Sequence, residues 1–115
     1  MQVNVNFETL ETMLNGDKET IRKVLNMVVS NSPKIVDSLM SNLETKNYAA
    51  IKQTIHSLKP QMVFLGLKKM LTYAEEIEKE SLVVSNPENY NFKVKNFIDL
   101  YLSIIFEIKE ELNTY

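Results

Sequence analysis

The chain has 115 residues, 44% hydrophobic and 24% charged, which suits one independently folded domain with its own core. Thirteen basic and fifteen acidic residues give a net charge of −2 without a dense basic stripe, so nothing favours nucleic acid binding. The lack of cysteine excludes disulfides, thiol catalysis and cysteine-ligated metals, while only two glycines and three prolines favour long helices.

The first predicted elements are a short amphipathic helix over Phe7–Leu14, which Gly16 ends, and a long helix that Asp17 can cap. The apolar face of the long helix recurs at steps of three, four and seven, through Ile21, Leu25, Val28, Ile35, Leu39 and Leu43. Pro33 lies inside this pattern and should kink the helix, because proline lacks a backbone donor. We predict one bent helix, with two helices as the alternative.

Two further helices follow a short connection at residues 45–47, where Asn47 can act as a cap. The first ends near Gly66 and has an apolar stripe of Ile51, Ile55, Leu58, Met62 and Leu65. The second runs to about Ser81 and turns Met70, Tyr73, Ala74 and Ile77 inward.

Residues 81–91 form the one extended loop that the sequence predicts, and Asn86-Pro87 within it suits a turn or a helix start. A last helix follows, with apolar residues Val94, Phe97, Ile98, Tyr101, Ile104, Ile105, Ile108 and Leu112. Four long amphipathic helices with short links predict an all-α, antiparallel up-down four-helix bundle with a short additional N-terminal helix. We expect residues 1–115 to form this single domain.

Neither end of the chain suggests export or membrane insertion. The N-terminus has no basic start followed by an apolar run, so we expect no secretory signal. The most apolar region, residues 97–108, is interrupted by Asp99, Ser103 and Glu107 and is too short to span a bilayer. We therefore expect a cytoplasmic protein that binds no membrane.

His56, the only histidine, is the candidate reactive residue. On a helical wheel the core residues of its helix lie roughly 130° away, whereas Lys52, Gln53, Lys59, Pro60 and Val63 lie within roughly 60°. The simplest interpretation of such a lone histidine is a surface residue without chemistry. One histidine without cysteines makes a poor transition-metal site, and no glycine-rich elbow or oxyanion hole accompanies Ser57 for hydrolase chemistry.

A phosphoryl acceptor needs less than these sites do. It needs an exposed neutral imidazole nitrogen as nucleophile, a cation that meets the phosphoryl charge, and a group that orients the other ring nitrogen. Lys59 lies three residues after His56 on the same helical face, and Lys52 lies four residues before it. The local sequence therefore permits phosphoryl chemistry without requiring it.

Residues 56–78, HSLKPQMVFLGLKKMLTYAEEIE, resemble the histidine-containing phosphotransfer (HPt) domain of multistep phosphorelays. The family's helix reads roughly His-x-Leu-Lys-Gly, then small residues, then Leu-Gly, with a second helix that ends in Leu-Glu. The matching positions are His56, Leu58, Lys59, Leu65 and Gly66, followed by Met70, Ala74, Ile77 and Glu78. The motif covers about a fifth of the chain, and the short first helix and the proline in the second helix also agree with the family.

The resemblance implies that His56 accepts a phosphoryl group on its outer nitrogen, Nε2, from an aspartate of a response-regulator receiver domain and passes it to another receiver. Lys59 would neutralise the phosphoryl oxygens, and Glu78 would orient the imidazole through its inner nitrogen. The receiver would supply an acidic pocket and Mg²⁺, and a hybrid histidine kinase is a further candidate partner. The chain would be a monomeric carrier with no cofactor or metal of its own and no autonomous kinase activity.

The sequence departs from the family next to the histidine. Pro60 stands where the family has glycine, and Val63 and Phe64 stand where small residues are usual. We expect these three residues and Lys52 to form a docking surface, although Phe64 could instead pack against the next helix. The departures also support an alternative function, a docking module that binds receivers without carrying phosphate. Two further alternatives are a kinase fragment, for which no nucleotide-binding motif is present, and a purely structural bundle.

Overall fold

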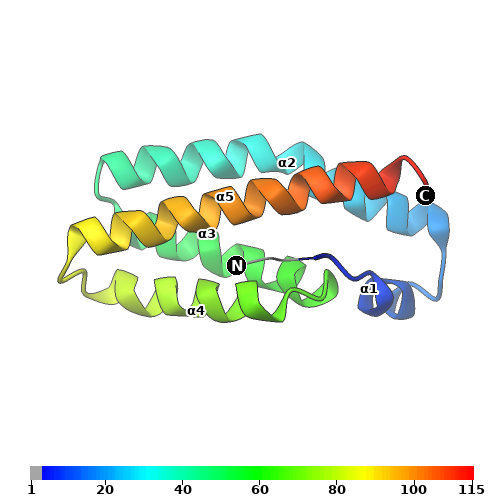
Figure 1. Cartoon of the computed structure of the whole chain (residues 1–115), viewed down its shortest axis with the longest axis horizontal. Coiled ribbons are helices and arrows are strands. Elements are labelled where there is room, and N and C mark those ends of the chain that lie inside the picture. Colours follow the sequence, from blue (N-terminus) through cyan, green and yellow to red (C-terminus); the bar gives the residue numbers. More distant parts are fainter. Residues whose placement is uncertain (1–3) are drawn as a thin grey trace.

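The computed structural model describes residues 4–115, which form five helices. These are α1 (Glu8–Met13), α2 (Lys18–Glu44), α3 (Tyr48–Phe64), α4 (Lys68–Leu82) and α5 (Pro87–Leu112). Figure 1 shows the four long helices side by side, with the chain reversing direction at each connection and α1 at one end. The bundle measures 45 × 22 × 22 Å. This architecture confirms the predicted all-α fold, and residues 4–115 contain no strand.

One continuous core fills the centre of the bundle. Its largest fully buried side chains come from every long helix: Tyr90, Phe97, Ile21, Leu25, Leu39, Ile51, Ile55, Leu58, Met70, Ile77, Ile108 and Val94. Burying a large apolar side chain stabilises a fold by about 1.5–3 kcal/mol, so these stripes determine which face each helix turns inward. Of the residues predicted to face the core, only Ile35, Tyr73 and Leu112 are half-buried. In the described part of the chain, no helix is long and apolar enough to cross a membrane.

The helix α2 continues through Pro33 without a break. Proline at this position has no N–H to donate to the carbonyl of Val29, one turn earlier. The hydroxyl of Ser32, which is buried, donates to that carbonyl at 2.7 Å. The neighbouring side chain thus supplies the hydrogen bond that the proline removes, and the prediction of one helix instead of two is confirmed.

Two helices begin at local capping signals, whereas the side chain of Asp17 makes no capping hydrogen bond at the start of α2. Asn47 accepts a hydrogen bond from the backbone N–H of Ala50 at 3.2 Å and begins α3. Asn86 does the same for Asn89 at 3.1 Å and begins α5, with Pro87 in its first turn. The prediction of an extended loop over residues 81–91 is therefore wrong, because only residues 83–86 lie outside the helices.

The turn between α3 and α4 is built around Gly66. This residue has a φ of +70°, a backbone conformation that residues other than glycine rarely adopt. The backbone N–H of Asn6 donates to the carbonyl of Leu65 at 2.8 Å, so the segment before α1 crosses directly over the turn. A Cβ atom at position 66 would lie 2.9 Å from the Cβ of Asn6. Gly66 therefore allows the tight connection that sets α3 beside α4, where the candidate site lies.

Candidate functional site

The helix α3 presents His56 to solvent. The side chain of His56 is 68% exposed, whereas Ile55 and Leu58 on the opposite side of the helix are buried. This division follows from the apolar stripe, because burying that stripe turns the residues opposite it outward. The helical wheel therefore predicted the direction of His56 correctly.

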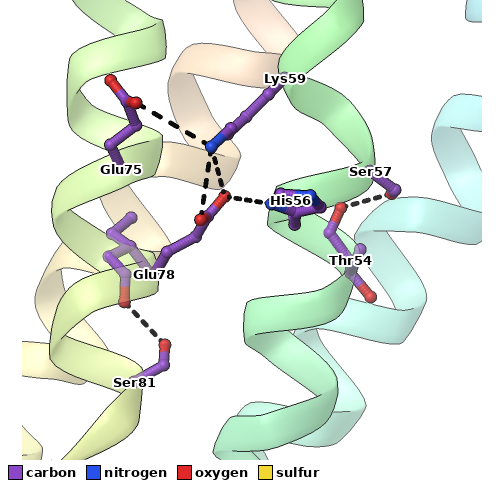
Figure 2. A network of polar contacts seen from close by, with 8 residues as sticks. Thr54, His56, Ser57, Lys59, Glu75, Glu78 and Ser81 are labelled. Atoms are coloured by element: carbon purple, nitrogen blue, oxygen red, sulfur yellow. Dashed lines mark hydrogen bonds and ion pairs between the residues drawn. The ribbon is translucent and has the colours of Figure 1, made fainter.

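Glu78 of α4 lies across the seam from His56. Its Oε1 atom is 3.2 Å from the imidazole Nδ1, and its side chain is only 14% exposed (Figure 2). In the neutral imidazole tautomer that fits this contact, Nδ1 carries the proton and donates to the carboxylate. The lone pair of Nε2 then points away from Glu78 and is free to act as a nucleophile.

Lys59 joins the same cluster from α3. Its Nζ atom lies 3.4 Å from Oε1 and 3.5 Å from Oε2 of Glu78, and it lies 3.9 Å from Oε2 of Glu75. Figure 2 shows the Glu78 carboxylate between the ammonium of Lys59 and the imidazole of His56. The carboxylate of Glu78 therefore contacts both the imidazole of His56 and the ammonium of Lys59.

Glu75 is a member of this cluster that the sequence reasoning missed. It lies three residues before Glu78 on α4, so helical spacing puts the two carboxylates on one face. That spacing was a usable signal, but the resemblance drew attention to Glu78 alone. The contact with Lys59 also depends on how α3 and α4 are paired, which no local pattern specifies.

An open groove runs beside His56 between the two helices. It is lined by Ala49, Lys52, Gln53, His56, Glu78, Ser81 and Leu82. Leu82 is 65% exposed and gives the groove an apolar end. The sequence reasoning had named Lys52 but not Ser81 or Leu82, which follow Glu78 by one helical turn.

The predicted docking residues differ in how much surface they offer. Pro60 and Val63 are exposed, and Lys52 is half-buried in the groove wall. Phe64 is half-buried and packs against the core, so only part of its side chain is available at the surface. The accessible apolar surface of this part of α3 therefore comes mainly from Pro60 and Val63.

The backbone next to the histidine lacks one helical hydrogen bond, because Pro60 lies inside α3. Pro60 has no N–H to donate to the carbonyl of His56, and no side chain in residues 4–115 donates to that carbonyl. The nearest hydrogen bond from a side chain to a backbone carbonyl in α3 runs from the hydroxyl of Ser57 to the carbonyl of Thr54, at 2.6 Å.

The described residues offer no metal-binding cluster. Residues 4–115 hold no group of three or more histidine or acidic side chains placed to bind an ion.

Comparison with known proteins identifies the fold. The sequence matches no protein-family model and no curated protein. The structure matches the crystal structure of the HPt domain of a sensor hybrid histidine kinase from Shewanella with a TM-score of 0.80. The match covers 96% of this chain and 95% of that chain, at 19% sequence identity. The chain therefore has the fold of an HPt domain, as the motif that begins at His56 predicted.

Proposed function

We propose that the chain is a phosphorelay carrier in which His56 accepts a phosphoryl group from a receiver-domain aspartate and passes it to another receiver. The observation that carries this proposal is the contact of 3.2 Å between Nδ1 of the exposed His56 and Oε1 of the nearly buried Glu78. It orients a nucleophilic nitrogen toward solvent on a fold that an HPt domain shares. A surface histidine without chemistry would not need an oriented ring.

In the proposed reaction, the lone pair of Nε2 attacks the phosphorus atom of the receiver's aspartyl phosphate. The N–P bond forms while the P–O bond to the aspartate breaks, and the aspartate leaves as a carboxylate with the electron pair. Because Nδ1 keeps its proton, positive charge develops on the ring of His56. The carboxylate of Glu78 stabilises that charge from 3.2 Å away, and the reverse reaction uses the same contacts.

Lys59 would neutralise the negative charge of the transferred phosphoryl group. Its ammonium is a flexible point charge with three donors, so it can exchange a carboxylate partner for a phosphoryl oxygen. Its present partners are 3.4 Å or more away, and its side chain is 23% exposed. The lysine is therefore near the imidazole without being fixed by a short contact.

The partner would supply the remaining parts. A receiver domain would bring the acidic pocket and Mg²⁺, while this chain needs no cofactor of its own and has no kinase activity by itself. His56 is surrounded by the groove, by the exposed Pro60 and Val63 and by the half-buried Lys52, which together offer a docking face with Phe64 at its edge. Docking would contribute to the rate by holding the phosphoryl group in line with Nε2.

The direct test is transfer from phosphorylated receiver domains of the same organism to the native chain and to His56→Gln. We expect an acid-labile, base-stable label on the native chain and none on His56→Gln, which should still bind receivers. Ser57→Ala is the control, since it changes the next exposed residue without touching the cluster, and it should be labelled like the native chain.

Two results would contradict the proposal. Binding of receivers without label on the native chain would make the chain a docking module, the alternative that Pro60 first suggested. A label that persists in His56→Gln would place the acceptor elsewhere.

A further inference from the structure

We infer that Glu75 is a positioning residue that limits how readily His56 holds a phosphoryl group, because Glu75 competes with that group for Lys59. This inference rests on the proposed phosphoryl chemistry of His56. It concerns a residue that contacts neither the imidazole nor the phosphoryl group and acts only through the lysine.

The polar cluster has more negative than positive charge. Two carboxylates, those of Glu75 and Glu78, share the single ammonium of Lys59 at distances of 3.4–3.9 Å. Lys59 is also the only cation within 4.0 Å of Glu75 in the described part of the chain. A phosphoryl group that arrives at His56 adds further negative charge to a cluster that already has two carboxylates for one ammonium.

The position of Lys59 makes this competition specific. The two carboxylates hold its ammonium on the Nδ1 side of the imidazole, as Figure 2 shows, whereas a phosphoryl group on Nε2 lies on the other side of the ring. Lys59 must therefore give up carboxylate contacts when it turns to the phosphoryl oxygens. Glu78 stays in place through its bond to His56, so Glu75 is the partner whose removal releases the lysine without disturbing the ring.

The size of the effect follows from exposure. Glu75 is 57% exposed and its contact with Lys59 is 3.9 Å long, so water screens the interaction. Exposed ion pairs contribute little free energy. We therefore expect Glu75→Gln to raise the ratio of phosphorylated to free His56 only about two- to five-fold. The effect should shrink as salt is added, because the interaction is electrostatic.

Glu76→Gln is the matched control. It makes the same change of charge one residue along α4, and Glu76 is likewise exposed. The charge of Glu76 acts on Lys93 of α5, which lies away from the cluster. Glu76→Gln should therefore leave the phosphorylated-to-free ratio of His56 within about 1.5-fold of the native value.

The experiment uses phosphoramidate, a small donor that phosphorylates imidazole with release of ammonia and needs no receiver. The phosphorylated fraction of His56 is measured by ³¹P NMR at a fixed ammonia concentration, where the exchange comes to equilibrium. The comparison includes the native chain, Glu75→Gln, Glu76→Gln and each of these in a Lys59→Met background. We expect the effect of Glu75→Gln to fall below about 1.5-fold once Lys59 is absent, because interacting residues are not additive.

The possible results separate this inference from the proposed function. Equal effects of Glu75→Gln and Glu76→Gln, or a full effect of Glu75→Gln in the Lys59→Met background, would overturn the role of Glu75. So would altered ¹⁵N shifts of the His56 ring in Glu75→Gln, which would mean that the tautomer had changed. A Lys59-dependent effect in a chain that no receiver can phosphorylate would support Glu75 while refuting the relay. Absence of label with phosphoramidate on the native chain and on Glu75→Gln alike would overturn the role of Glu75, whereas the relay itself is decided by transfer from receivers.

Discussion

Pro33 in α2 and Pro60 in α3 both lie inside helices and remove the same kind of hydrogen bond, but only one of the two bonds is replaced by a side chain. Each removes the backbone donor that would pair with the carbonyl four residues earlier. At Pro33 the hydroxyl of Ser32 donates to the freed carbonyl of Val29 at 2.7 Å. At Pro60 no side chain in residues 4–115 donates to the freed carbonyl of His56.

The surroundings explain the difference. Both prolines are exposed, but the residues whose carbonyls lose a donor differ, since Val29 is half-buried and His56 is exposed. An unpaired carbonyl away from water costs about 1–3 kcal/mol, while an exposed one bonds to solvent. A side chain therefore replaces the lost hydrogen bond at the more buried of the two residues. Beside the candidate acceptor, at an exposed residue, no side chain replaces it.

The largest effect on stability should come from removing the replacement bond. We expect Ser32→Ala to lower the free energy of unfolding by about 1–2 kcal/mol, because the carbonyl of Val29 loses its donor. Urea unfolding measures the change. Ser57→Ala is the matched control, since its hydroxyl makes the same bond three residues back, to Thr54 at 2.6 Å, on the exposed face. It should cost less than about 0.5 kcal/mol, and equal losses for the two variants would contradict the comparison.

Restoring the backbone donors should give a smaller effect of opposite sign. Pro60→Ala supplies an N–H for the carbonyl of His56, and we expect a net gain of about 1 kcal/mol after the greater freedom of the unfolded chain is subtracted. Pro33→Ala should gain less, because the carbonyl of Val29 already has a donor. Thermal or urea unfolding of both variants tests this order. A larger gain at Pro33 would show that Ser32 does not replace the missing bond.

Tyr101 is a buried polar group that the fold leaves unpaired, because its hydroxyl has no hydrogen-bond partner within residues 4–115. It therefore tests whether buried polar groups in this fold are always paired. We expect Tyr101→Phe to change stability at neutral pH by less than about 0.5 kcal/mol, since no bond is lost. Tyr90→Phe, which breaks the bond of 2.7 Å to the hydroxyl of Ser81, should cost about 1 kcal/mol. Equal costs would mean that Tyr101 also has a partner, such as a buried water molecule.

The same tyrosine predicts a response to alkaline pH. Burial raises the pKa of Tyr101 to about 12, whereas a tyrosine in the unfolded chain titrates near its ordinary value of 10. The unfolded state therefore releases its proton first, and stability should fall as the pH rises from about 10 to about 12. Tyr101→Phe should remove part of this fall, which unfolding measured across that range would detect. An unchanged fall would contradict the burial of the hydroxyl.

Local sequence patterns predicted most of the helices. The apolar stripes repeat with the helical period, and Asn47 and Asn86-Pro87 are helix starts that act within a few residues. The loop over residues 81–91 was overestimated although a local signal limits it, since Asn86-Pro87 begins α5 within that stretch. The helices extend to Leu82 and from Pro87, and the hydrogen bond between the hydroxyls of Ser81 and Tyr90 joins them across the short connection.

The candidate site was predictable only in part, because it combines residues of two helices. Helical spacing indicated that Lys59 shares a face with His56, but the wheel contains no information about α4. The expectation for Glu78 came from the family resemblance, and the role of Glu75 depends on how α3 and α4 pair. Gly66 was recognised as a helix end, whereas its approach to Asn6 involves a segment sixty residues earlier in the chain.

In the proposed relay, His56 carries the phosphoryl group on Nε2 while Nδ1 remains protonated beside Glu78. The most direct measurement is a long-range ¹H–¹⁵N correlation spectrum of the imidazole after phosphorylation, which distinguishes the two ring nitrogens. We predict that Nε2 bears the phosphorus and that Nδ1 keeps its proton. A phosphoryl group on Nδ1, or on any residue other than His56, would contradict this arrangement.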